Sequence, residues 1–168
     1  MATDVVERMN EAQRHRGPDD HGIETIRFRG GTVVLGNTRL AIIDTSAAGH
    51  QPMKDVETGN WITYNGETYN FKELRLEIGG EWVSNTDTEV VVRGYGKWGA
   101  GVFSKLRGMF ALAIWDERRQ RLLLARDPLG IKPLYYHATS TQLIFASELR
   151  AVLASGLVAR RLCDAGVD

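Results

Sequence analysis

Residues 109–125, MFALAIWDERRQRLLLA, contain two apolar segments joined by the short polar run DERRQ at 116–120. Two apolar segments separated in this way predict a β-hairpin. Both segments are apolar at nearly every position, whereas a strand with one face in water alternates apolar and polar residues. The hairpin is therefore predicted to belong to a sheet that is covered on both faces.

Other patterns on either side of this hairpin predict helices and further strands. Apolar spacing predicts a helix over residues 3–14, and the capping box TDTE at 86–89 begins a second one. The strand at 61–64 is predicted to end at a turn formed by Asn65 and Gly66. Further predicted strands span 32–36, 39–43, 134–136 and 143–145, and Ser147 is predicted to cap a last helix. Helices combined with doubly covered antiparallel strands predict a layered α+β sandwich.

Composition limits the classes of function. The chain has 168 residues, the length of one ordinary domain, with 43% hydrophobic and 25% charged residues. Lys and Arg total 21 and so do Asp and Glu, so the formal charge is zero and a nucleic-acid partner is not expected. The sequence contains no apolar run of about 20 residues, so no membrane association is expected either. The sequence has a single cysteine, Cys163, which excludes an internal disulfide and makes the reducing cytoplasm the expected location. Cys163 itself is expected to be an inert thiol.

Three polar positions stand out because they lie where strands end or helices begin. Arg39 opens the apolar segment 39–43, Asn65, Gly66 and Glu67 follow the strand at 61–64, and Asp87 lies in the first turn of a helix. Binding and catalytic sites are commonly built at such places. Each has a purely structural alternative, namely a surface ion pair for Arg39, a type I′ turn for Asn65 and Gly66, and a favourable helix-dipole contact for Asp87.

Eight longer segments carry a more specific signal. In chain order they are residues 15–19 (HRGPD), 39–44 (RLAIID), 49–53 (GHQPM), 64–70 (YNGETYN), 84–89 (SNTDTE), 106–111 (LRGMFA), 125–136 (ARDPLGIKPLYY) and 145–149 (FASEL). In this order they resemble the glutaminase domain of the glutamine-hydrolysing asparagine synthetases. That family belongs to the class II glutamine amidotransferases, among the N-terminal-nucleophile hydrolases. The resemblance covers nearly the whole chain.

The resemblance implies a four-layer αββα sandwich of two mainly antiparallel sheets. Residues 1–156 are expected to form a glutamine amidotransferase domain that lacks the family's first strand. Residues 157–168 are expected to be a tail leading toward an ATP-dependent synthetase domain. The implied partners are L-glutamine and that synthetase domain, with a homodimer as a further option. No cofactor or metal is expected in this chain, because ATP and Mg²⁺ are expected only in the synthetase domain.

The resemblance also implies roles for particular residues. The Asn65 side-chain amide and the Gly66 backbone N–H match the family's oxyanion-hole donors. Arg39 matches the residue that pairs with the glutamine α-carboxylate, and Asp87 the one that pairs with the α-ammonium. Glu67 is expected to position that end of the substrate. Leu40 and Ile42, on the strand expected to carry Arg39, are expected to shape the pocket through their backbone.

One departure from the family concerns catalysis. The family's nucleophile is an N-terminal cysteine on the first strand, and the sequence here begins with Met1, Ala2 and Thr3. Cys163 is far from that position, so the chain is expected to be inactive alone. Two interpretations remain open. In the first, the chain is part of an asparagine synthetase involved in asparagine biosynthesis. In the second, the chain is a non-catalytic scaffold domain, as in the β-lactam synthetase relatives.

Overall fold

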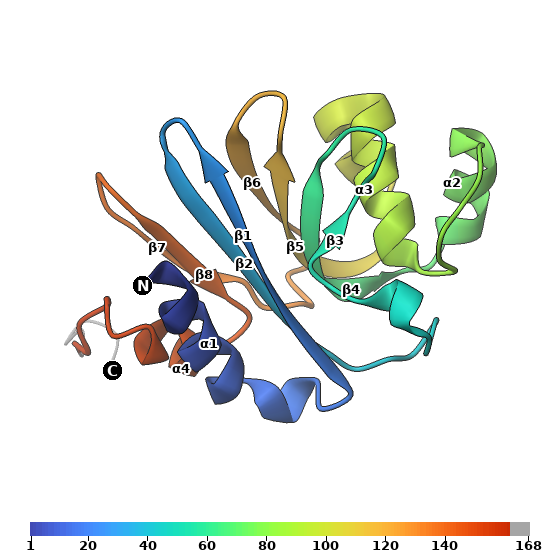
Figure 1. Cartoon of the computed structure of the whole chain (residues 1–168). Helices are drawn as coiled ribbons and strands as arrows, with labels where there is room; N and C mark the ends of the chain where they lie inside the picture. The colour runs from blue at the N-terminus through green and yellow to red at the C-terminus, as the bar shows by residue number, and fades with distance from the viewer. Residues whose placement is uncertain (162–168) are drawn as a thin grey trace.

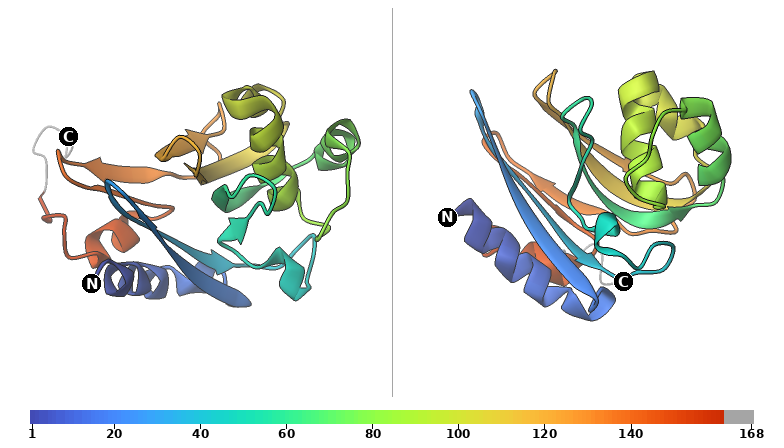
Figure 2. Two further views of the ribbon diagram at one scale, coloured as in Figure 1. Left: turned by 45° about the horizontal axis from the view of Figure 1, so that its top comes forward. Right: turned by 45° about the vertical axis from the view of Figure 1, so that its right-hand side comes forward.

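The computed structural model describes residues 1–161, whose helices and strands are stacked in four layers (Figure 1). The two inner layers consist of strands and the two outer layers of helices (Figure 2). The strands are β1 (Asp20–Phe28), β2 (Gly31–Arg39), β3 (Met53–Lys54), β4 (Trp61–Thr68), β5 (Gly108–Asp116), β6 (Arg121–Arg126), β7 (Tyr135–Ala138) and β8 (Leu143–Ala146). The α-helices are α1 (Ala2–Ala12), α2 (Phe71–Ile78), α3 (Asp87–Trp98) and α4 (Leu149–Ala154), with short 3-10 helices at Arg14–Arg16, Ala47–Gly49 and Gly99–Ser104.

One inner layer is a four-stranded antiparallel sheet in the order β3-β4-β5-β6. The predicted hairpin at 109–125 forms its β5 and β6, and that prediction is confirmed. Helix α3 covers the outer face of this sheet, where Val91 and Tyr95 pack against Ile62 and Leu112. All four of these side chains are buried, which explains why β4 and β5 are apolar on this face.

The other inner layer is made of two antiparallel hairpins, β1-β2 and β7-β8. Helices α1 and α4 lie side by side on its outer face (Figures 1 and 2). Met9 of α1 and Val152 of α4 pack with Ile144 of β8 in one buried cluster. The predicted hairpin over 134–145 is thereby confirmed as β7-β8.

The two β layers pack face to face through a third apolar cluster. Leu35 of β2 and Trp115 of β5 are almost fully buried at its centre, and Phe28 of β1 lies 4.8 Å from the Trp115 ring between centroids. Phe145 of β8 contributes to the same cluster. The expected four-layer α+β sandwich is therefore confirmed. Within the described residues one of its β layers consists of two hairpins rather than a single sheet.

Two predictions about strands are wrong. Residues 39–43 do not form a strand of their own, because β2 runs from Gly31 through Arg39 and then ends. Asn65 and Gly66 do not form a turn, because β4 continues through them to Thr68. Pairing with β5 overrides the local turn signal, since Asn65 lies opposite Ala111 and Gly66 opposite Phe110. In addition, β1 was not predicted.

The predicted helix caps have different outcomes. Thr86 caps α3, and its hydroxyl accepts a hydrogen bond from the backbone N–H of Glu89 at 3.1 Å. Ser147 does not cap α4, because Glu148 occupies that position and the Ser147 hydroxyl contacts Asn65 instead. No helix within residues 1–161 is both long and apolar enough to cross a membrane.

Candidate functional site

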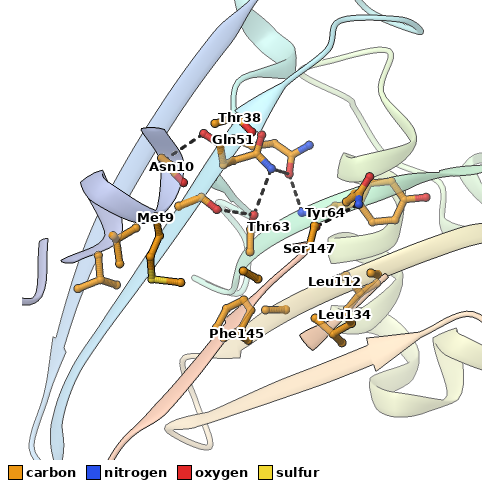
Figure 3. A pocket seen from close by; sticks show the side chains of 18 of the residues that line it. Met9, Asn10, Thr38, Gln51, Thr63, Tyr64, Leu112, Leu134, Phe145 and Ser147 are labelled. Atoms are coloured by element: carbon orange, nitrogen blue, oxygen red, sulfur yellow. Dashed lines mark hydrogen bonds between the residues drawn. The ribbon is translucent and has the colours of Figure 1, made fainter. Parts of the chain in front are cut away.

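The residues predicted to form the site line one cavity of about 750 Å³ between the two β layers. Figure 3 shows other side chains that line this cavity, among them Gln51, Tyr64 and Ser147. They come from the end of β2 and the loop after it, from β4, and from the start of α3. The structure therefore brings together residues separated by up to 48 positions in the sequence. The seven residues are Arg39, Leu40, Ile42, Asn65, Gly66, Glu67 and Asp87.

Arg39 is the last residue of β2, and its side chain is 9% exposed. Its guanidinium donates to the backbone carbonyls of Asp44 and Ser46, the latter at 3.0 Å. A Cβ built on Gly49 would lie 2.0 Å from Arg39 Nη2, so a larger residue there would displace the guanidinium from its present position. A guanidinium has five N–H donors, and two of them are used here. The remaining donors can serve an anion in the cavity.

Asp44 ties the loop after β2 to the segment that begins α3. One carboxylate oxygen accepts from Ser46 N and the other from Asn85 N, both at 2.9 Å. Hydrogen bonds from Ser46 and Asn85 lower the pKa of Asp44 to about 2, so its carboxylate is ionised at neutral pH. This contact fixes the loop that receives the Arg39 side chain.

Leu40 and Ile42 are in this loop and not on a strand, which corrects the prediction. Their side chains are 55% and 71% exposed, although both residues line the cavity. Apolar side chains in such a position stabilise little by burial. Any contribution of these residues to a bound ligand therefore depends on the backbone or on coverage by another segment.

Asn65 and Glu67 are two residues apart on β4, so their side chains share the face that borders the cavity. The Asn65 Nδ2 atom donates to the Ser147 hydroxyl at 3.1 Å, which orients the amide. A Cβ on Gly66 would lie 2.3 Å from the carbonyl oxygen of Met109 on β5. Glycine at position 66 therefore lets β4 and β5 approach closely beside the cavity.

Asp87 begins α3 and is 5% exposed. Its carboxylate accepts a hydrogen bond from Thr68 N at 2.8 Å, and the start of a helix favours negative charge. Burial nevertheless raises the pKa of Asp87 above its ordinary value. Burial and the nearby Asp87 carboxylate also raise the pKa of Tyr64, whose hydroxyl is 2.9 Å from that of Thr68. The cavity thus has a buried carboxyl whose charge is only partly compensated.

Two further residues at the cavity were not predicted as site residues. Ser147 holds Asn65, as described above. The buried Gln51 amide accepts from Tyr64 N at 2.7 Å (Figure 3). It also donates to Thr88 Oγ1 at 3.3 Å, which links β4 to α3. Gln51 lies within the segment 49–53 that resembles the family, which is the one sequence signal that marks it.

Similarity to known proteins agrees with this geometry. Residues 1–168 match the family model described as glutamine amidotransferase domain. The chain is 41% identical over 155 residues to asparagine synthetase [glutamine-hydrolyzing] 1 of Bacillus subtilis, covering 90% of this chain and 24% of that protein. It is 42% identical over 147 residues to amidase chry2 of Gibberella zeae, covering 85% of this chain and 21% of that protein.

The fold has a counterpart among solved structures. The glutamine phosphoribosylpyrophosphate amidotransferase of B. subtilis superimposes with a TM-score of 0.76 at 19% identity, over 92% of this chain and 41% of that chain. The chain spans between 21% and 32% of the length of the first four curated relatives it matches. The match to the family model extends over the whole chain. The protein therefore belongs to the glutamine amidotransferase domain family.

Proposed function

We propose that the cavity is the glutamine-binding site of a glutaminase, an enzyme that hydrolyses the side-chain amide of L-glutamine to supply ammonia for an amidation reaction. The observation that carries this proposal is the cavity lining. It combines a guanidinium with free donors at Arg39, a buried carboxyl at Asp87, and amide donors at Asn65 and Gly66. A zwitterionic amino acid with a side-chain amide matches this set of charges and donors.

Each part of glutamine is assigned a partner. The α-carboxylate pairs with the free donors of Arg39, since a guanidinium fits a carboxylate with two parallel hydrogen bonds. The α-ammonium pairs with Asp87, whose buried position strengthens the attraction to a cation. Glu67 assists at that end, and the backbone at Leu40 and Ile42 closes the pocket. Asn65 and Gly66 receive the side-chain carbonyl oxygen.

The chemistry needs a cysteine thiol as nucleophile, with an amine as base. Sulfur attacks the amide carbon, the carbonyl oxygen becomes an oxyanion, and ammonia leaves with the proton taken from the thiol. Water then hydrolyses the thioester, releasing glutamate and restoring the thiol. The Asn65 side chain and the Gly66 N–H stabilise the oxyanion, by roughly 2.7–4 kcal/mol per donor. The contact from Ser147 keeps the Asn65 amide in place.

We further propose that the polypeptide of residues 1–168 binds glutamine without hydrolysing it. None of residues 1–161 is a cysteine, and Cys163, expected to be an inert thiol, lies outside the described residues. Purified protein incubated with glutamine is expected to release no ammonia above a no-enzyme blank. Ammonia release that Asn65→Ala abolishes would contradict this part of the proposal.

The relatives suggest the wider reaction. Several are asparagine synthetases, so we propose that the ammonia serves asparagine biosynthesis in the cytoplasm through a synthetase domain. Under this proposal ATP and Mg²⁺ act in that domain. Because the chain spans only part of those relatives, the acceptor is set by residues outside this chain.

Titration calorimetry with L-glutamine tests the binding site. Arg39→Gln is expected to weaken binding, because the carboxylate loses a charged partner. Arg118→Ala is the matched control, since this exposed arginine lies in the polar connection between β5 and β6 and does not line the cavity. Equal binding by wild type and Arg39→Gln would contradict the carboxylate assignment.

The absence of cysteine from residues 1–161 favours a second candidate, a non-catalytic scaffold domain. A domain of that kind is expected not to bind glutamine in this cavity. The same calorimetry distinguishes the two candidates, because a scaffold gives no glutamine heat signal at any concentration, whereas a glutaminase pocket saturates.

A further inference from the structure

We infer that Gln51 is a positioning residue, whose side chain fixes the edge of β4 from which the Gly66 N–H points into the cavity. This role rests on the proposed function, in which the Gly66 N–H stabilises the oxyanion. Gln51 itself is assigned no contact with glutamine. It lies in the segment between β2 and β4, and it is 7% exposed.

The two edges of β4 have different neighbours. One edge pairs with β5 over the whole strand, from Trp61 to Thr68. On the other edge, β3 pairs only with Trp61 and Ile62. The rest of that second edge, from Tyr64 to Thr68, has no neighbouring strand among the described residues, and we call it the open edge.

The Gly66 N–H points to the open edge. Phe110, the partner of Gly66 on β5, directs its N–H and its carbonyl to Asp127, and therefore away from β4. Gly66 and Phe110 are thus a pair without mutual hydrogen bonds, because backbone groups of successive residues in a strand point to opposite edges. Tyr64 and Thr68, two residues to either side of Gly66, direct their N–H groups to the open edge as well.

The three N–H groups of the open edge differ in their partners. Tyr64 N donates to Gln51 Oε1 at 2.7 Å (Figure 3), and Thr68 N donates to the Asp87 carboxylate at 2.8 Å. Gly66 N, between them, has no hydrogen-bond partner among residues 1–161. Two side-chain acceptors therefore occupy the open edge on either side of one free donor, which is the donor assigned to the oxyanion.

Gln51 is held by three partners, so it can fix the strand rather than follow it. Besides its contact with β4, its Nε2 atom donates to Thr88 Oγ1 at 3.3 Å, and its Oε1 atom accepts from Asn37 Nδ2 at 3.4 Å. Thr88 follows Asp87 in α3, and Asn37 lies in β2 two residues before Arg39. The Gln51 side chain therefore contacts the three elements that carry Arg39, Asp87 and the oxyanion donors.

Loss of the Gln51 carbonyl would leave the N–H of the buried Tyr64 without its acceptor. A buried donor without a partner is unfavourable, and the strand can relieve this by shifting until the N–H finds a new acceptor. Gly66 lies two residues away on the same edge, so its N–H would move with such a shift. We therefore expect the oxyanion donor to be displaced although Gln51 does not touch it.

Gln51→Met and Thr63→Val are the matched variants for the test. Methionine is an unbranched side chain that brings neither the donor nor the acceptor of the amide. Thr63 belongs to the same buried polar network, since its hydroxyl donates to the Gly36 carbonyl at 2.9 Å and accepts from Asn37 Nδ2 at 3.2 Å. Valine removes these bonds but none at the open edge. Both variants are expected to lower Tm, which controls for the loss of buried hydrogen bonds.

Calorimetry with L-glutamine and the nuclear magnetic resonance signal of the Gly66 amide are measured for wild type and both variants. Gln51→Met is expected to bind glutamine about tenfold more weakly and to shift the Gly66 amide signal. Thr63→Val is expected to keep the wild-type affinity and signal. Equal weakening by both variants at equal loss of Tm would make Gln51 merely structural and overturn the inference, as would an unshifted Gly66 signal in Gln51→Met.

Two further results separate this role from the proposed function. If the wild type binds no glutamine, the proposed function fails, and the Gly66 amide signal alone decides the role of Gln51. Should Gln51→Met fail to fold, amide hydrogen exchange of the wild-type chain tests the same edge. The Tyr64 and Thr68 amides are expected to exchange more slowly than the Gly66 amide between them. A Tyr64 amide that exchanges as fast as the Gly66 amide would show that Gln51 does not hold it, and would overturn the inference.

Discussion

Replacing Gly66 with alanine tests the contact that places the proposed oxyanion donors. The added Cβ would lie 2.3 Å from the Met109 carbonyl oxygen and 2.8 Å from Phe110 Cα, both backbone atoms of β5. Backbone cannot move aside as a flexible side chain can, so β4 and β5 must separate locally. Overpacking of this kind costs about 1–3 kcal/mol of unfolding free energy.

The matched control is Gly101→Ala. A Cβ at Gly101 meets no atom within 4 Å, and this glycine lies in a 3-10 helix far along the chain from β4. Its expected effect on the unfolding free energy is within about 0.5 kcal/mol. Both variants therefore add one methyl group, but only Gly66→Ala adds it against a neighbouring strand.

Thermal and urea denaturation followed by circular dichroism measure the difference. For a chain of this size, 1 kcal/mol corresponds to about 2–4 °C in Tm, so Gly66→Ala is expected to lower Tm by roughly 2–12 °C. The same displacement should weaken glutamine binding, because the Gly66 N–H moves with the strand. A Gly66→Ala protein as stable as Gly101→Ala would refute the described packing of β4 on β5.

Three other predictions concern the site and the core. Glutamine affinity should fall as the pH is lowered through the raised pKa of Asp87, because the protonated carboxyl carries no charge. The variant Asp87→Asn should bind glutamine about 10- to 100-fold more weakly, and calorimetry across pH should show that its affinity no longer depends on this titration. An unchanged pH profile would contradict the ammonium assignment. Thr86→Ala removes the cap of α3 and should lower the free energy of unfolding, measured by urea denaturation, by about 1 kcal/mol. Thr141→Ala, at an exposed position, is the control and should leave the free energy of unfolding nearly unchanged. Leu35→Ala should lower the free energy of unfolding by about 2–5 kcal/mol, because Leu35 is fully buried between the β layers. A smaller loss would mean that the two layers do not pack against each other at this residue.

The parts of the fold that could be predicted are those with strong local patterns. Residues 109–125 formed the expected hairpin because their apolar side chains are buried on both faces. The apolar run at 40–43 was wrongly predicted as part of a strand. It lies in the loop after β2, where the Asp44 carboxylate accepts a hydrogen bond from Asn85 N. Similarly, Asn65 and Gly66 signal a turn locally, and only pairing with β5 keeps them in a strand.

The candidate site was less accessible to local reasoning. Arg39, Asn65 and Asp87 each have an ordinary structural interpretation, and they became a set only through resemblance to a family. The structure adds that they line one cavity. Gln51 and Ser147 were not predicted as site residues because their roles depend on partners 13 to 82 positions away, and no local pattern encodes such contacts.

Nuclear magnetic resonance of the isotope-labelled chain, titrated with L-glutamine, tests the central claim most directly. The proposal predicts saturable shifts of the Asn65 side-chain amide and the Gly66 backbone amide. D-Glutamine, whose α-substituents are arranged with the opposite hand, should produce much smaller shifts at the same concentration. Shifts confined to residues outside the cavity, or equal shifts with both enantiomers, would contradict the assignment of this cavity as a glutamine site.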